Sequence, residues 1–331
     1  MSSIARLSSI IRPVFSSCVF SFALIGLLWN EASTAELTTE QSKTGVKVLI
    51  DGKLFTEYLF RSGSKPVLWP VIGPHGIEMT RAYPFKEIKG DKTDHIHHRS
   101  IWFTHGNVNG TDFWLEVAKD RKGGTIEQRD ISVKEGNGKV QIESTNDWMT
   151  PQRKKVLEDK RVMTFGVDGE NRVIDFDITL TAGDEPAVIG ETKEGSFGIR
   201  VPHVMSVDAK QGGKIINSRG QKDGDAWGKP AEWVDYHGAV KDEQGKSNHV
   251  GIAVLNHPSS FRAPTHWHVR TYGLFAANPF GLHDFDKNQP EGAGAVTLKP
   301  HESLTLRYRV IFHAGDEQQA GIAAAYEKYA K

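Results

Sequence analysis

Two stretches of this sequence alternate apolar and polar residues with a period of two. Residues 174–180 read I-D-F-D-I-T-L, and residues 304–312 read L-T-L-R-Y-R-V-I-F. This period places the apolar side chains on one face of a half-buried β-strand. Further strand-like runs follow one another without the strand–helix alternation that builds parallel sheets. We therefore predict an all-β fold of about twelve to sixteen short strands, in antiparallel sheets that form a sandwich or a large barrel.

Turn residues separate these runs at short intervals. Asp51-Gly52 lies between two apolar runs and predicts a hairpin, and Gly136-Asn137-Gly138 and Asp168-Gly169 indicate a meander over residues 125–181. Only the end of the chain has a helical period. There we expect Asp316 to cap a helix whose inner face carries Ile322, Ala323, Tyr326 and Tyr329.

The first 35 residues have the features of a targeting segment. Arg6 and Arg12 precede an apolar stretch over residues 14–29, and Ser33-Thr34-Ala35 ends in small residues. This order is typical of a signal peptide, so we expect residues 1–35 to be removed after about Ala35 and the protein to be periplasmic or secreted. An uncleaved anchor is the alternative, although serines interrupt the apolar stretch. Residues 36–331 would then form a single domain.

The composition of the remaining chain excludes several classes of protein. The full sequence has 41 basic and 41 acidic side chains, and removal of Arg6, Arg12 and Glu31 with the first 35 residues leaves the chain nearly neutral, which argues against a nucleic-acid partner or an anionic membrane surface. The only cysteine, Cys18, lies in the targeting segment, so no disulfide framework is expected. No later segment has the roughly 18 apolar residues that span a bilayer, so no membrane partner is expected after signal removal.

Histidine is unusually frequent, and six of the 14 histidines lie in two short segments. The first, residues 94–106, reads D-H-I-H-H-R-S-I-W-F-T-H-G. In a strand, His95, His97 and Arg99 would share one face. The second, residues 264–272, reads P-T-H-W-H-V-R-T-Y, and in a strand His266 and His268 would share a face while the intervening tryptophan points into the core. Adjacent strands could bring both segments to one pocket.

The other histidines carry less information one by one. A single histidine is more often a surface or hydrogen-bonded core residue than a ligand. We give this interpretation to His75, His237, His249, His283, His301 and His313. Tryptophans beside polar residues, such as Trp114 and Trp233, could offer platforms to the apolar face of a sugar ring, with core packing as the simpler explanation.

The two dense segments support two kinds of chemistry that the sequence does not separate. In the first, histidines act as general acid and base while arginines and aromatic residues orient the substrate. Its candidate catalytic residues are His97, His98, His105, His266 and His268, and its candidate substrate-binding residues are Asp94, Arg99, Asn109, Trp114, Glu116, Arg270 and Tyr272. In the second, a divalent transition metal is the cofactor, with His95, His97, His266 and His268 as ligands.

Four segments resemble the PmoA-like family of exported bacterial proteins, which carries the label methane oxygenase. They are residues 94–114, 195–202 (G-S-F-G-I-R-V-P), 233–238 and 256–281, and the resemblance spans nearly the whole mature chain. Ser100 stands where the family's H-H-R-G run has glycine. The family's pattern is similar to galactose-mutarotase-like sandwiches, in which histidines and a carboxylate act on a sugar ring.

The fold class we predict is thus a large antiparallel β-sandwich of the galactose-mutarotase-like supersandwich type with a C-terminal helix. The function we predict is that of an exported carbohydrate-active enzyme, an epimerase, lyase or hydrolase, with a small molecule or glycan as substrate. The alternatives are a metal-dependent oxidoreductase or hydrolase and a non-catalytic glycan-binding protein.

Overall fold

The two alternating stretches are strands in the structure, a computed structural model that describes residues 1–2, 35–116 and 123–331. Residues 174–180 lie in β9 (Asn171–Thr181), and residues 304–312 lie in β18 (Ser303–Ala314). The two strands pair antiparallel, with Leu180 opposite Leu304. Their apolar side chains are buried on a shared face, as the period of two predicts.

Two sheets of eight strands form the fold, and every strand pair between described residues is antiparallel. In spatial order the first sheet contains β1 (Leu37–Gln41), β2 (Gly45–Ile50), β3 (Lys53–Ser62), β4 (Lys65–Val71), β5 (Ile101–His105), β11 (Gly195–Arg200), β16 (Leu274–Asn278) and β15 (His266–Val269). The second contains β12 (Lys214–Asn217), β13 (Trp233–Lys241), β14 (Ser247–Asn256), β18, β9, β8 (Lys155–Asp168), β7 (Lys139–Met149) and β6 (Thr125–Gly136).

Short elements complete the described part of the chain. Strands β10 (Ala187–Ile189) and β17 (Val296–Leu298) form a separate pair. The helices are α1 (Leu282–Phe285) and α2 (Ile322–Tyr329), and the 3₁₀ turns are Pro74–Gly76, His203–Met205, Val207–Ala209 and Asp223–Ala226. None of these helices is long and apolar enough to cross a membrane. Residues 35–331 form one compact unit.

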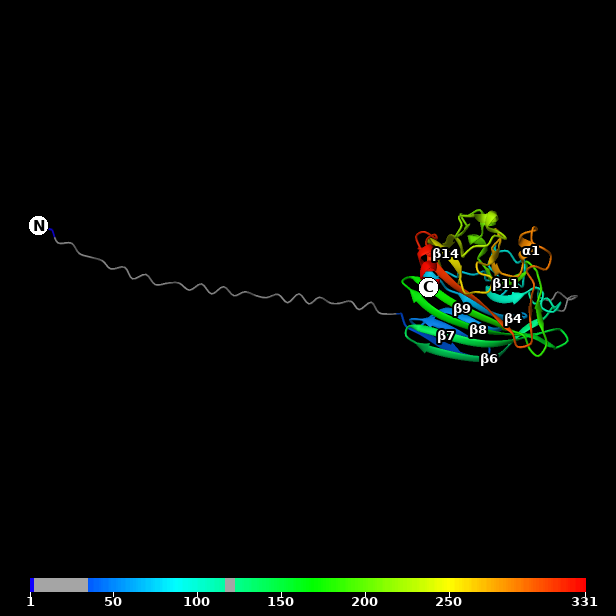
Figure 1. Ribbon diagram of the computed structural model, residues 1–331. Helices are drawn as coiled ribbons and strands as arrows, with labels where there is room; N and C mark the ends of the chain where they lie inside the picture. The colour runs from blue at the N-terminus through cyan, green and yellow to red at the C-terminus, as the bar shows by residue number, and fades with distance from the viewer. Residues whose placement is uncertain (3–34, 117–122) are drawn as a thin grey trace. The chain divides into compact units, whose positions relative to one another are not determined.

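The main core lies between the two sheets. Phe197 of β11 stacks on Tyr308 of β18, with ring centroids 5.0 Å apart, and Phe103 of β5 contacts Trp148 of β7 at 6.0 Å. Strands β6 to β9 of the second sheet run as long neighbouring strands in Figure 1. Inward-facing residues of both sheets therefore pack face to face, which makes the fold a sandwich. The predicted antiparallel β-sandwich with a C-terminal helix is confirmed.

The strand count and the C-terminal helix differ in detail from the prediction. The described residues form strands up to β18, more than the sixteen expected. In α2, Ile322 is buried and Tyr326 and Tyr329 pack against the second sheet, but Ala323 is exposed and Ala325 takes its place on the inner face. Asp316 accepts hydrogen bonds from backbone N–H groups in the turn before α2, so it caps that turn and not the helix.

One predicted strand is wrong. Residues 94–100 form a loop that leads into β5, and His95 and Ser100 have φ angles of 46° and 54°. Positive φ interrupts the extended backbone that a strand requires. Ser100 thus adopts the left-handed backbone region that favours glycine. The predicted targeting segment lies outside the described residues except for its ends.

Candidate functional site

A buried arginine holds the loop of residues 94–100. The Arg81 guanidinium donates hydrogen bonds to the carbonyl oxygens of Asp94, His95 and His98 at 2.8–3.1 Å, and to the Asp94 carboxylate at 2.7 Å. Its side chain has no exposed surface. Because carbonyl groups in a loop lack ladder partners, one guanidinium fork here replaces the hydrogen bonds of a strand. Burial, followed by the repulsion of Arg200, lowers the pKa of Arg81 to about 10.

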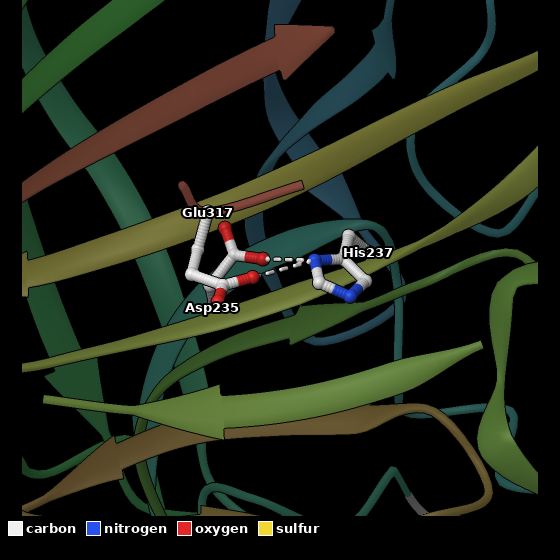
Figure 2. Close-up of side chains that lie close together, drawn as sticks. All are labelled: Asp235, His237 and Glu317. Carbon is white, nitrogen blue, oxygen red and sulfur yellow. Dashed lines mark ion pairs between the residues drawn. The ribbon is translucent and has the colours of Figure 1, made fainter. Parts of the chain in front are cut away.

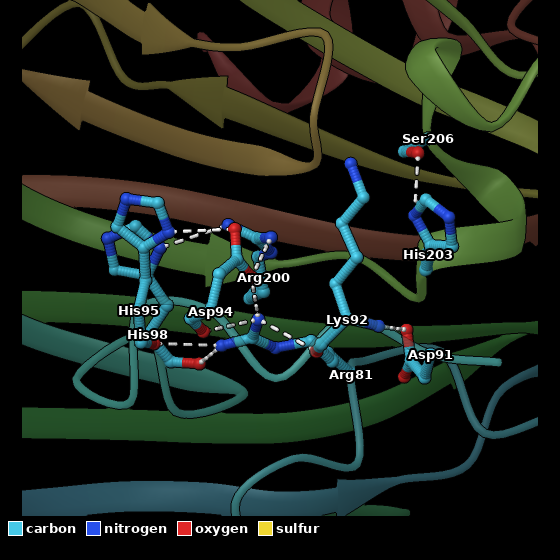
Figure 3. Close-up of polar contacts among 9 residues, drawn as sticks. All are labelled: Arg81, Asp91, Lys92, Asp94, His95, His98, Arg200, His203 and Ser206. Carbon is cyan, nitrogen blue, oxygen red and sulfur yellow. Dashed lines mark hydrogen bonds and ion pairs between the residues drawn. The ribbon is translucent and has the colours of Figure 1, made fainter. Parts of the chain in front are cut away.

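The Asp94 carboxylate joins this loop to the first sheet. It accepts hydrogen bonds from Arg81, from Arg200 at the end of β11 at 2.9 Å, and from His95 Nδ1 at 2.8 Å. Partial burial alone would raise the pKa of Asp94, but Arg200 and the bond from His95 lower it to about 2. Asp94 is therefore an anion in a cationic frame, as Figure 3 shows.

Four rings are stacked from the sheet outward. His98 lies over Trp102 of β5 at 5.3 Å, His95 lies over His98 at 4.8 Å, and Tyr272 lies over His95 at 5.4 Å, each pair within 14° of parallel. Gly198 of β11 makes room for the stack, because a Cβ there would lie 2.5 Å from the Trp102 ring. Figure 3 shows the His95 and His98 rings close together beside Arg200. Arg200 donates to His98 Nδ1 at 3.1 Å, so the other nitrogen of a neutral His98 carries the proton.

His97 lies beside this stack among charged residues. Its ring contacts His98 at 4.4 Å and the buried Trp114 at 6.3 Å. Next to it, the Glu116 carboxylate accepts hydrogen bonds from Lys65 at 3.1 Å and from Arg99 at 2.5 and 2.6 Å. Burial lowers the pKa of Lys65 to about 8, although the attraction of Glu116 opposes this effect. Burial and the Lys65 charge lower the pKa of His97 to about 3.

The second histidine segment is a strand, as predicted. In β15, Trp267 and Val269 point into the core, and His266 and His268 lie on the opposite, outer face of the first sheet. His266 stacks on Phe285 of α1 at 5.9 Å. His268 Nδ1 donates to the Lys193 carbonyl at 2.8 Å, and its ring contacts Trp227 at 6.4 Å.

Arg270 and Tyr272 connect the two histidine segments. The Arg270 guanidinium lies over the Trp227 ring at 5.7 Å and over the Tyr272 ring at 5.8 Å. Trp227 contacts His268, and Tyr272 contacts His95, so a continuous chain of contacts runs along the outer face of the first sheet. We name this surface the histidine face. It comprises His95, His97, His98, Trp114, Trp227, His268, Arg270 and Tyr272.

Burial keeps three histidines of this face, His97, His98 and His268, neutral. It lowers the pKa of His98 well below the ordinary value, with His97 and Arg200 adding to the effect. It lowers the pKa of His268 to about 4, against the attraction of Glu194. Burial also raises the pKa of the Tyr272 phenol, which therefore retains its proton at neutral pH. The site thus has uncharged imidazoles and a protonated phenol beside fixed cations.

Two candidate residues lie apart from the histidine face. His105 points from β5 into the sandwich, where its Nε2 donates to the Gly190 carbonyl at 2.7 Å and its ring contacts Phe280 at 5.1 Å. Burial lowers its pKa to about 4. Asn109 lies in a turn, and its Oδ1 accepts from the Val188 N–H at 2.6 Å. We assign structural roles to both because neither contacts the other candidates.

The proposed metal ligands do not converge. Among the described residues, one group of three ligating side chains is close enough to share an ion, and it is Asp235, His237 and Glu317 on the second sheet. His95 instead donates to Asp94, and His266 packs flat on Phe285. The ligands do not converge because residues 94–100 form a loop. In this loop the His95 and His98 rings stack on each other, whereas a strand would align alternate side chains on one face.

The sequence reasoning overlooked several residues of the site. Arg81 and Arg200 form the frame of the loop, and Lys65 neutralises Glu116. Arg200 belongs to the G-S-F-G-I-R-V-P segment and was thus within reach of the sequence pattern. Arg81 and Lys65 had no such signal, since their importance comes from burial alone.

Comparison with solved structures finds likeness across most of the chain at low identity. A GH36 α-galactosidase from Geobacillus stearothermophilus matches with 12% identity and a TM-score of 0.42, over 85% of this chain and 40% of that one. A putative aldose 1-epimerase from Klebsiella pneumoniae matches with 9% identity and a TM-score of 0.42, over 90% and 88% of the two chains. A galactose mutarotase related enzyme from Lactobacillus acidophilus matches with 11% identity and a TM-score of 0.35, over 84% and 97%.

The protein accordingly spans well under half the length of the galactosidases that it matches. No curated protein matches its sequence. A family model does match, over residues 45–327, and its description is a family of unknown function, DUF6807. That match covers every strand of the two sheets except β1, and every residue of the histidine face. The chain therefore belongs to the DUF6807 family.

Proposed function

We propose that this protein is an exported carbohydrate-active enzyme that binds a sugar on the histidine face and transfers a proton there. The observation that carries the proposal is the position of Arg270. Its guanidinium lies between two aromatic rings and forms no hydrogen bond or ion pair with another described residue. Unused donors beside aromatic faces suit a ligand that is apolar on one face and has hydroxyl or carboxylate groups at its edge.

His268 is the base in this proposal. Its Nδ1–H donates to a backbone carbonyl, so the lone pair of the neutral ring is on Nε2. The lowered pKa, about 4, keeps this nitrogen unprotonated at neutral pH and ready to accept a proton. Tyr272, which retains its phenolic proton, is the acid.

The carboxylates favour epimerase or lyase chemistry over hydrolysis. Glycoside hydrolysis generally uses two carboxyl groups that are free to act as acid and as base or nucleophile. Here Asp94 is bound by Arg81 and Arg200, and Glu116 is bound by Arg99 and Lys65. A proton transfer between imidazole, phenol and sugar needs neither carboxylate to titrate.

Export is part of the same proposal and rests on residues 1–35 and on the resemblance to the PmoA-like family. Expression of the full chain in a bacterial host, with mass spectrometry of the periplasmic and secreted fractions, tests it. We expect a mature protein that begins near Glu36. Recovery of the intact amino terminus in the cytoplasm contradicts export.

The enzyme proposal is tested with a panel of aldoses, uronic acids and glycosides, followed by proton NMR in D₂O. Incorporation of deuterium or conversion of the anomer is the expected result for at least one substrate. His268→Gln should lower kcat about 100-fold, and Tyr272→Phe about tenfold or more. His301→Gln is the matched control, because His301 is exposed elsewhere on the chain.

Three outcomes separate the alternatives. If the wild-type protein binds a sugar without turnover, and Arg270→Met weakens this binding, the result supports the alternative of a non-catalytic glycan-binding protein. Turnover that survives His268→Gln overturns the assignment of the base. Absence of both binding and turnover across the panel overturns the carbohydrate proposal as a whole.

A further inference from the structure

The second sheet carries its own cluster of ionisable residues, on the face turned away from the core. Asp235 and His237 are two residues apart in β13 and share this outer face, while Val234 and Tyr236 point into the core. Glu317, from the segment between β18 and α2, lies against them. Figure 2 shows the three side chains turned toward one another.

The three ligating atoms are close but poorly paired. Asp235 Oδ1 lies 3.0 Å and a Glu317 oxygen 3.5 Å from His237 Nδ1. Asp235 Oδ1 and His237 Nδ1 are buried, yet neither forms a hydrogen bond of acceptable geometry with any described residue. The side chain of Glu317 is only 13% exposed, and among the described residues His237 is its one ion-pair partner. Burying two carboxylates with so few donors is costly unless a cation is present.

The surrounding residues keep these atoms directed at one point. His313 of β18 donates from Nε2 to the other oxygen of Asp235 at 2.6 Å and fixes the orientation of the carboxylate. Gly251 of β14 lies between His237 and His313 in the sheet, and a Cβ there would be 2.4 Å from the His313 ring and 2.9 Å from His237 Cβ. A carboxylate held by a histidine outside the ligand set is a common second layer around metal ions.

We propose that Asp235, His237 Nδ1 and Glu317 bind one divalent transition-metal ion of the zinc type. Ligands about 2.0–2.1 Å from a tetrahedral ion lie about 3.3 Å from one another, and the observed 3.0 and 3.5 Å lie on either side of that value. Two carboxylates balance the charge of the ion. Mg²⁺ and Ca²⁺ fit less well, because they take six or more oxygen ligands.

The ion would join the C-terminal segment to the second sheet. Glu317 precedes α2, which packs on the outer face of that sheet through Ile322. Three protein ligands leave one coordination position open. His249, whose ring is 5.1 Å from that of His237, is exposed and outside the ligand group.

The test uses the chain produced without a histidine tag, stripped with a chelator and titrated with ZnCl₂ and, in parallel, MgCl₂. We expect about one equivalent of zinc and a rise in Tm of roughly 5 °C or more. Glu317→Gln should weaken zinc binding at least about 100-fold and abolish the rise in Tm. The metal-free Tm of this variant should be unchanged or higher, because a buried charge is removed, so loss of binding is not confused with failure to fold.

Two further variants locate the site. His249→Gln, the neighbouring imidazole outside the group, should bind zinc within about threefold of wild type, and so should His268→Gln on the histidine face. Less than about a tenth of an equivalent of zinc in the wild-type protein means that the cluster is only an ion pair and overturns the proposal. So does full affinity in Glu317→Gln, or a loss confined to His268→Gln.

Discussion

The two sheets each carry a group of buried histidines on their outer faces, and the two groups have opposite surroundings. On the first sheet, His97 and His98 lie among Lys65, Arg81 and Arg200, and burial with these charges lowers their pKa values. On the second sheet, Asp235 contacts His313, and the pKa of His313 is raised even though burial opposes this. Burial lowers the pKa in both groups, so the difference between them comes from the sign of the neighbouring charge: cations add to the effect of burial, whereas the Asp235 carboxylate reverses it.

The largest effect is expected from the residue that organises the first group. Arg81→Met leaves four carbonyls and the Asp94 carboxylate without their buried donor, and should lower the free energy of unfolding by about 3–5 kcal/mol. Chemical denaturation measures the loss, and hydrogen exchange should rise over residues 94–98. Arg129→Met is the control, because the Arg129 side chain is 43% exposed and its ion pairs should contribute less than about 1 kcal/mol. Equal losses in both variants would contradict the role of Arg81.

The histidine group of the second sheet can be disturbed at Gly251, which lies between His237 and His313. Gly251→Ala places a Cβ against the His313 ring and should destabilise the protein by about 1–3 kcal/mol. Gly166→Ala in β8 is a matched control, because its Cβ would meet only Lys139 Cγ at 3.9 Å. Thermal unfolding compares them. If the two variants lose equal stability, then the close approach of His237 and His313 is not required by the fold.

The neutral histidines make a prediction about pH. His97 stays unprotonated in the folded chain down to about pH 3, whereas in the unfolded chain a histidine binds a proton near pH 6.5. Between these values the unfolded state binds more protons, so stability falls as the pH falls, by up to about 1.4 kcal/mol per pH unit for this residue. In His97→Gln the slope between pH 6 and 4 should be shallower by about 1 kcal/mol per unit. Above pH 7 the two curves should run parallel, and identical slopes at low pH would refute the burial of a neutral His97.

The smallest effect on stability is expected at Arg270. Its contacts with Trp227 and Tyr272 are of the cation–π type, so Arg270→Met should change the free energy of unfolding by less than about 1 kcal/mol. The same change should weaken binding of a sugar ligand at least about tenfold. Arg309→Met reverses the pattern: Arg309 is paired to both oxygens of Asp175, so stability falls and sugar binding is unaffected. A stability loss at Arg270 as large as that at Arg309 would show that Arg270 is structural.

The fold could be predicted where local sequence and tertiary environment agree. The alternation in residues 174–180 and 304–312 identified β9 and β18, and Asp51-Gly52 identified the hairpin between β2 and β3, because a half-buried strand and a tight turn impose their own residue patterns. The same reasoning placed Trp267 in the core and His266 and His268 on the outer face. The joint position of the two histidine segments was only a hypothesis, and contacts through Tyr272 and Arg270 now connect them.

The loop of residues 94–100 and the cluster on the second sheet could not be predicted, because both depend on partners that are distant in sequence. The alternation of His95, His97 and Arg99 imitated a strand, but Arg81 supplies the hydrogen bonds that make a loop stable there. His237 and His313 were each interpreted as an ordinary surface or core histidine, and Asp235 was not singled out. Only the register of β13, β14 and β18 brings these residues together, and pairing register is not readable from one strand alone.

The manner in which Arg81 holds its loop has a consequence for how this family can diversify. Four of its five acceptors are backbone carbonyls, which every amino acid possesses, so this anchorage depends little on which side chains the loop carries. Residues 95 and 96, whose side chains are exposed, are therefore open to exchange while the path of the chain is kept. A library randomised at these positions, with Arg81 and Asp94 retained, would sample new ligand preferences on an unaltered scaffold.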